Sequence, residues 1–146
     1  MKEVEYIGGN LIEQMQALLH DASEAYMADL PKPIKFGLPD FVQLEDDISR
    51  VIMKRYNLPL EMLSKVDTAD RTVLHREAYA LFKREPGWLS NLSKDEIKCA
   101  KRLPLSIPMS SHQASLEFKQ QFNAVWSDTI EFRISEEHKK KSQQRL

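Results

Sequence analysis

The sequence has a single cysteine, Cys99, among its 146 residues. One thiol cannot form an intramolecular disulfide, and it cannot supply the several cysteines of a Cys-rich zinc module. These absences exclude the small disulfide-stapled folds as a class. They favour a reducing, cytoplasmic setting.

Long apolar runs and a strong net charge are also missing. No stretch approaches the roughly 20 apolar residues that cross a bilayer. The opening residues MKEVEYIGGN lack the apolar centre of a signal peptide. We therefore expect a protein that neither is secreted nor spans a membrane. The 21 basic and 22 acidic residues nearly cancel, so no broad positive field is available to gather a nucleic-acid polymer.

No segment alternates like a strand and no repeat is present, whereas apolar residues recur at three-to-four spacing throughout the chain. We expect one all-α domain, a compact bundle of about four to six helices. The predicted helices cover about residues 10–28, 39–57, 64–83, 93–103 and 112–132. Residues 1–9 are predicted to be a loose leader, residues 10–132 the domain, and residues 133–146 a polar, disordered tail.

The first two helices have recognisable boundaries and apolar stripes. Asn10 and Glu13 have the spacing of a capping box. The helix they open is predicted to bury Leu11, Met15, Leu18, Ala22 and Tyr26. The next helix is predicted to bury Phe41, Leu44, Ile48, Val51 and Ile52. These stripes predict which helix faces form the core.

Polar residues interrupt this pattern in the first helix. His20, Asp21 and Glu24 share the side opposite the apolar stripe. They can be an ordinary solvated face, or one wall of a metal site. The small residues Ala17 and Ala28 lie in the same sector, which favours a groove over open solvent.

A second interruption lies in the third helix. Asp70 and Glu77 fall on the stripe made by Val66, Val73 and Leu81. A carboxylate on a core face needs a cation or a hydrogen-bond donor, and a salt bridge to another helix is the ordinary solution for both. With the imidazole and carboxylate of the first helix, however, Asp70 would complete a set of donors that a divalent metal accepts.

Three segments carry a resemblance to a known family: HDASEAYMADLPKPIK, VDTADRTVLHREAYALF and LPLSIPMSSHQASLEFKQQFN. In this order they resemble the HD-domain metal-dependent phosphohydrolases, in the branch similar to bacterial 5′-deoxynucleotidases and their prophage-encoded relatives. The resemblance covers roughly residues 10–132 and implies an HD-type helical domain.

The resemblance also implies roles for individual residues. His20, Asp21 and Asp70 correspond to ligands of a divalent ion, which can be Mn, Co, Mg, Zn, Ni or Fe. Glu24 corresponds to a general acid or base. Asp29, Lys32 and Lys35 correspond to substrate-binding positions, and Glu77 to a structural or supporting one. For Lys35 an ordinary surface lysine remains the alternative.

The implied activity is metal-assisted hydrolysis of a phosphomonoester, with deoxynucleoside 5′-monophosphates as substrates and a homodimer as the assembly. The alternative is a degenerate HD domain that binds a nucleotide or a protein partner without turnover. A purely structural helical module would leave the three matching segments as coincidence.

The family has an earlier histidine ligand, and none of the nineteen residues before His20 is a histidine. His75 lies five residues after Asp70, so it is predicted to turn away from the site as a partly exposed residue. The open alternatives are completion of the site by water, a ligand from a second copy, or an internal start in the printed chain.

Overall fold

A computed structural model describes residues 9–82, 93–94, 97–98 and 109–143. Every regular element in this part of the chain is helical, which confirms the predicted all-α class. No helix in the described ranges is both long enough and apolar enough to cross a membrane. In chain order the elements are α2 (Leu11–Leu19), the 3₁₀ helix η1 (Ala22–Ala25), α3 (Lys32–Lys35), α4 (Pro39–Arg55), α5 (Ser64–Phe82) and α7 (Ser111–Gln143).

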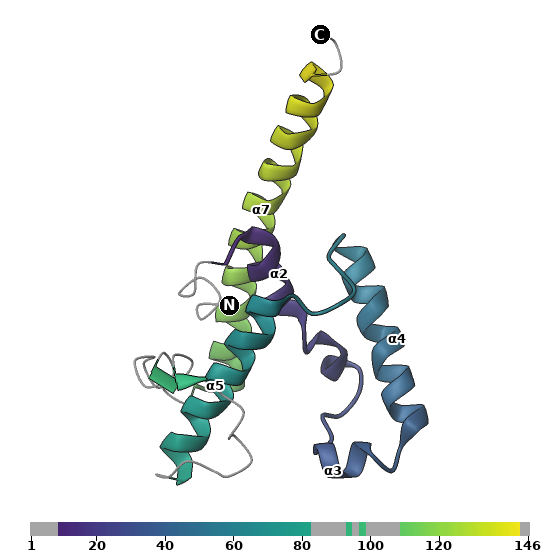
Figure 1. The fold of residues 1–146 in the computed structure, drawn as a ribbon, viewed down its shortest axis with the longest axis vertical. Helices are drawn as coiled ribbons and strands as arrows, with labels where there is room; N and C mark the ends of the chain where they lie inside the picture. The colour runs from purple at the N-terminus through teal and green to yellow at the C-terminus, as the bar shows by residue number, and fades with distance from the viewer. Residues whose placement is uncertain (1–8, 83–92, 95–96, 99–108, 144–146) are drawn as a thin grey trace.

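Helix α2 lies at the centre of the arrangement and contacts α4, α5 and α7. Most of helix α4 stands apart from α5 and α7 in Figure 1; it packs mainly against α2, α3 and η1, and its C-terminal end reaches α7. The C-terminal part of α7 projects beyond the other helices (Figure 1). The position of α2 between the other elements is what allows its C-terminal end to carry a shared site.

The first helix begins where predicted and ends earlier. The Asn10 side chain accepts from the backbone N–H of Glu13, and the Glu13 carboxylate accepts from the backbone N–H of Asn10 at 2.7 Å, so the capping box is present. Helix α2 ends at Leu19, and a tighter 3₁₀ turn follows. The predicted single helix over residues 10–28 is therefore wrong. The break redirects Tyr26, which was predicted to be buried and is 76% exposed.

Helix α4 ends in a Schellman motif. Asn57 adopts a left-handed φ of 52°, and the Leu58 N–H donates to the Met53 carbonyl at 2.9 Å. Arg133 of α7 donates to the carbonyls of Tyr56 and Asn57 at 3.1 and 2.8 Å. A cation at the carbonyl end of a helix is favourable, so α7 fixes the end of α4.

The main core forms where α2, α4 and α7 meet. Its buried members are Met15, Leu19, Met53, Leu58 and Val125. Tyr56 contacts Phe122 and Trp126 of α7 edge-on, with ring centroids 5.5 and 5.3 Å apart. Only one side of α4 is held in this way. Of the predicted α4 stripe, Leu44 and Val51 are exposed, so that part of the prediction is wrong.

Gln16 connects α2 to the chain that leads into α5. It is 2% exposed, and its amide nitrogen donates to the carbonyls of Pro59 and Glu61 at 3.1 and 2.9 Å. Its amide oxygen accepts from the Leu63 N–H at 2.8 Å. A buried amide with its donors and acceptor used in this way is stabilising, and it sets where α5 begins.

Helix α5 has the predicted bounds within one residue, and a different face is buried. The buried residues are Val66, Ala69, Thr72, His75 and Ala78. Glu77 is exposed and Leu81 is 77% exposed, so the predicted core stripe is right at Val66 and wrong beyond it. His75 is buried rather than partly exposed, and its Nδ1 has no hydrogen-bond partner among the described residues. Val66 and Ala69 on this face pack against Ala17 of α2. The spacing of apolar residues in the sequence does not show that small residues form this contact.

Helix α7 continues through Gln143, past the predicted end at residue 132. Its last turns contain no proline or glycine, so nothing in the sequence stops the helical backbone there. Residues 1–8 of the predicted leader and most of the predicted helix over residues 93–103 lie outside the described residues.

Replacing Gln16 tests its role in positioning α5. We expect Gln16→Ala to lower the free energy of unfolding by about 2 kcal/mol, because the buried hydrogen bonds are lost together with side-chain packing. Urea unfolding followed by circular dichroism measures this. Gln14→Ala is the matched control, since Gln14 makes one hydrogen bond, to the Gly9 carbonyl. Equal losses in the two variants would contradict the assigned role of Gln16.

Candidate metal and phosphate site

The break between α2 and η1 brings three side chains together. His20 follows the last residue of α2, and Asp21 immediately precedes η1. His20 Nε2 lies 2.9 Å from Asp21 Oδ2 and 3.7 Å from Asp70 Oδ1 of α5. The structure thus joins residues from separate helices that the sequence predicted to converge. Their proposed role as metal ligands stays a prediction.

The second nitrogen of His20 is also engaged. Nδ1 lies 2.9 Å from the Ala17 carbonyl oxygen, to which an Nδ1–H donates. This bond orients the ring and leaves Nε2 facing the two carboxylates. A backbone carbonyl on the far nitrogen is a common way in which proteins fix a histidine that binds metal.

The carboxylates make His20 strongly basic. Hydrogen bonds to Asp21 and then Asp70 raise its pKa to about 10, against the opposing effect of burial. The bond from His20 in turn lowers the pKa of Asp70. The cluster is a protonated imidazole held by two carboxylates, with side-chain exposures of 21% for His20, 63% for Asp21 and 50% for Asp70.

One imidazole and two carboxylates are donors that a divalent ion accepts, but here the carboxylates are paired with the imidazole itself. Neighbouring donors around a first-row ion lie about 3.0–3.4 Å apart, given metal–ligand distances of about 2.1 Å, and the two separations at Nε2 bracket that range. In this conformation both carboxylates approach the imidazole nitrogen itself. Among the described residues, no group of three or more His, Cys, Asp or Glu side chains is already arranged to hold a metal. Ion binding therefore requires His20 to release its proton.

Glu24 lies on η1, close in sequence to the cluster. Partial burial, followed by the negative charges of Asp21 and Asp29, raises the pKa of its carboxyl group. A raised pKa suits a carboxyl group that must carry a proton before delivering it. The role of Glu24 as a general acid or base stays a prediction.

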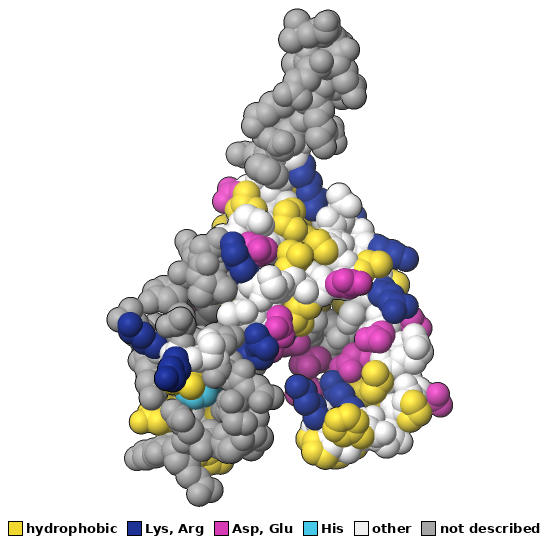
Figure 2. Space-filling view, in the orientation of Figure 1, with side chains coloured by type: hydrophobic (Ala, Val, Ile, Leu, Met, Phe, Trp, Pro, Cys, Tyr) yellow, Lys and Arg dark blue, Asp and Glu magenta, His cyan; other side chains and the backbone are white. Residues whose placement is uncertain are grey.

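The two predicted lysines are in different settings. Lys35 Nζ lies 2.8 Å from Glu45 Oε1 and 3.7 Å from Asp29 Oδ1, and the hydrogen bond to Glu45 raises its pKa. Lys35 therefore ties the α3 segment to α4. Lys32 is exposed, and its positive charge helps to lower the pKa of Asp70. Figure 2 shows acidic side chains around a hollow in the lower half of the molecule, with basic side chains across it.

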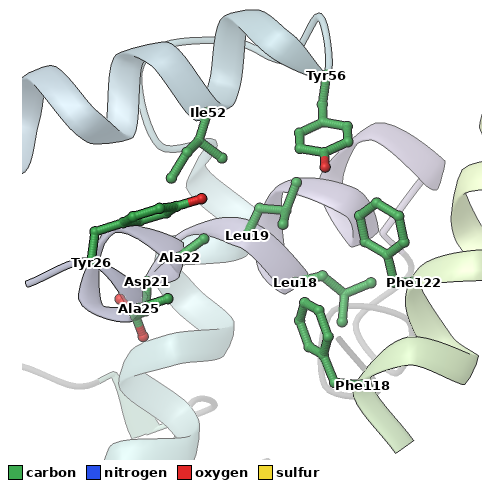
Figure 3. A pocket seen from close by; sticks show the side chains of 10 residues that line it. All are labelled: Leu18, Leu19, Asp21, Ala22, Ala25, Tyr26, Ile52, Tyr56, Phe118 and Phe122. Carbon is green, nitrogen blue, oxygen red and sulfur yellow. The ribbon is translucent and has the colours of Figure 1, made fainter. Parts of the chain in front are cut away.

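An apolar pocket adjoins the cluster and shares Asp21 with it. It encloses about 560 Å³ between the α2–η1 segment, α4 and α7. Figure 3 shows the Tyr26 ring along one wall, near Ile52, while the Asp21 carboxylate points away from the cavity. Its lining comprises Leu18, Leu19, Asp21, Ala22, Ala25, Tyr26, Ile52, Tyr56, Phe118 and Phe122.

The aromatic lining of this pocket was missed at the level of sequence. Phe118 and Phe122 stack with centroids 6.1 Å apart, and Phe118 is 44% exposed. Their spacing of four residues indicated one helix face, and Tyr26 was expected in the core. Nothing in the spacing showed that these rings would border an opening next to Asp21.

Comparisons with known proteins identify one segment of similarity. Over 62 residues, 42% of the chain, the sequence is 45% identical to the uncharacterized protein YfdR of Escherichia coli (strain K12). That match spans 35% of the length of YfdR. No family model matches the chain, and no solved structure matches it. The similarity shows a relationship over the matched segment and assigns no activity.

The electrostatics of the cluster predict how its stability depends on pH. With a folded pKa of about 10 against an ordinary 6.5, protonated His20 stabilises the fold fully below pH 6.5, and this effect is lost as the pH rises towards 10. The lowered pKa of Asp70 means that its contribution is present above its ordinary 3.8 and is lost as the pH falls below it.

We therefore expect Asp70→Asn to lower the urea midpoint more at pH 5.5 than at pH 9.5. The measurement is made with a chelator present, so that no metal contributes. Asp67→Asn is the matched control, because Asp67 pairs with Arg71 on its own helix. A gap between wild type and Asp70→Asn that stays constant across this range would contradict the protonated cluster.

Proposed function

We propose that the chain is a metal-dependent phosphohydrolase that removes phosphate from nucleotides, most specifically deoxynucleoside 5′-monophosphates. The observation that carries the proposal is the approach of Asp70 to His20, at 3.7 Å from a separate helix. Two carboxylates and one oriented imidazole are a donor set that divalent ions accept. An ordinary salt bridge between His20 and one carboxylate does not need a fixed ring orientation. Here the Nδ1 contact with the Ala17 carbonyl turns Nε2 towards both Asp21 and Asp70.

In this proposal His20, Asp21 and Asp70 hold the ion. A divalent ion, when bound, supplies a more acidic water and positive charge against the phosphate. Because His20 must lose its proton to ligate, affinity for the ion rises with pH while the imidazole is still protonated in the metal-free protein. The residue set is the same one that the resemblance to HD-domain enzymes implies.

The remaining side chains handle the phosphate ester. Glu24 acts as the general acid or base: it holds the attacking water or delivers a proton to the leaving 5′ oxygen of the sugar. Lys32 contacts the phosphate, because it is exposed and its positive charge acts on Asp70 of the cluster. Lys35 positions Asp29, which lies 3.7 Å from its Nζ, near the sugar.

The pocket beside Asp21 supports a nucleoside as the group that carries the phosphate. Its volume of about 560 Å³ lies within the range of small-molecule sites. Aromatic side chains such as Tyr26 and Phe118 offer faces on which a base can stack. The shared Asp21 places this apolar space next to the metal cluster.

The proposal includes a homodimer in the cytoplasm. The single cysteine suits a reducing compartment. Exposed apolar side chains on α4 offer a surface that a second copy could cover.

Phosphate release tests the activity. We expect purified protein loaded with Mn²⁺ or Co²⁺ to release phosphate from deoxynucleoside monophosphates. Asp70→Asn should reduce both metal content and turnover by at least about 100-fold, because a ligand is lost. Glu24→Gln should keep the metal and lose turnover by about 100-fold, because proton transfer is lost. Asp67→Asn should retain both properties.

The outcomes separate the alternatives. Metal or nucleotide binding without phosphate release would favour the degenerate HD domain. The small number of candidate donors in the cluster, which are His20, Asp21 and Asp70, also supports this alternative. An absence of metal binding, nucleotide binding and turnover in freshly folded protein would contradict the proposal as a whole.

The two lysines provide a further test. We expect Lys32→Gln to raise KM about 10-fold with little change in stability, because one charged contact to phosphate is lost. Lys35→Gln should instead lower the unfolding midpoint, since Glu45 is only 17% exposed at its side chain and loses its partner. Steady-state kinetics and urea unfolding of both variants measure the difference. The reverse pattern would show that Lys35 is the phosphate contact.

A further inference from the structure

Helix α4 carries an apolar stripe that no other described element covers. Leu44 and Val51 are 53% and 67% exposed, and Ile48 lies between them, half-buried. These positions follow each other at intervals of four and three residues, which places them along one line of the helix. Exposed stripes of this kind mark interaction surfaces.

A shallow groove continues the stripe onto η1 and its flank. It encloses about 390 Å³ and is lined by Tyr26, Asp47, Ile48, Val51 and Ile52. Nearly all of its exposed lining is apolar. Several aliphatic side chains from a second helix lying along α4 would fit into this groove and cover its apolar lining.

The charges beside the stripe identify that second helix. Asp40 lies in the first turn of α4 and Asp47 at its centre, and Arg50 and Lys54 lie on the same flank in the second half. All four are exposed. In an antiparallel pair related by a two-fold axis through the middle of α4, Asp40 of one copy faces Lys54 of the other, while Asp47 lies near the axis.

The ion pair formed within this flank of α4 is weak, so its charged side chains can also pair with a second copy. Arg50 lies 3.8 Å from Asp47 on its own helix, with both side chains more than half exposed. Exposed pairs at such distances contribute little, so an intermolecular partner competes readily. A parallel arrangement would instead bring like charges together, which disfavours it.

We propose that α4 is a self-association surface, and that its occupant is α4 of a second copy packed antiparallel about a two-fold axis. Leu44 of one copy lies near Val51 of the other, and each copy places an apolar side chain in its partner's groove. This interface specifies the homodimer of the proposed function. It does not involve the metal ligands, so association and phosphate release can fail separately.

Sedimentation equilibrium across a range of protein concentrations tests the interface. We expect a wild-type dimer that weakens as salt is added, because the flanking charges are screened. Val51→Glu should raise the dimer dissociation constant at least about 10-fold, because a charge replaces a central apolar contact. Leu60→Glu is the matched control, since Leu60 is exposed to a similar degree outside α4.

A charge exchange makes the test specific to the antiparallel pairing. One variant carries Asp40→Lys with Asp47→Lys, and the other carries Arg50→Glu with Lys54→Glu. Each variant alone should be monomeric at concentrations where the wild type is dimeric, and an equal mixture should form heterodimers. Circular dichroism checks that each variant is folded.

Two results would overturn the proposal. A wild-type chain that stays monomeric at every concentration would mean that the stripe serves another partner. A dimer that keeps its affinity in Val51→Glu and in both charge variants would place the contact elsewhere. If Val51→Glu fails to fold, recovery of the dimer on mixing the charge variants still decides the matter.

Discussion

The amide of Gln16 is the interaction on which the site depends most. From a buried position on α2 it holds the carbonyls of Pro59 and Glu61 and the N–H of Leu63. These contacts fix where the chain turns into α5. The register of α5 then decides whether Asp70, two turns further on, reaches the imidazole of His20. Gln16, a neutral side chain away from the cluster, thereby sets how closely Asp70 of α5 approaches His20 at the end of α2.

The sequence predicted the helical class, the start of α2 and the approach of Asp70 to His20 and Asp21, whose role as metal ligands stays a prediction. The start of α2 was predictable because its signal is local: a capping box, confirmed by reciprocal hydrogen bonds. The approach of Asp70 was predicted from the resemblance to HD-domain enzymes. The bounds of α4 and α5 were also close, since proline and an Asn in the left-handed conformation mark their ends.

The faces of the helices were less predictable, and the reason is tertiary. Asp70 was expected in the core and is half exposed, and His75 was expected near solvent and is buried. Where α5 meets α2, Val66 and Ala69 pack against Ala17, so the buried face of α5 differs from the predicted stripe beyond Val66. Tyr26 left the core because α2 ends at Leu19, nine residues before the predicted end at residue 28.

A metal ion bound at His20 must replace the proton on Nε2, while the Nδ1–H bond to Ala17 stays in place. The imidazole ¹⁵N NMR signals of His20, recorded with and without one equivalent of Zn²⁺ at pH 8, report on both nitrogens. We expect Nε2 to lose its proton and take the shift of a metal-bound nitrogen, while Nδ1 stays protonated. A His20 ring that remains doubly protonated in the presence of Zn²⁺ would contradict this expectation.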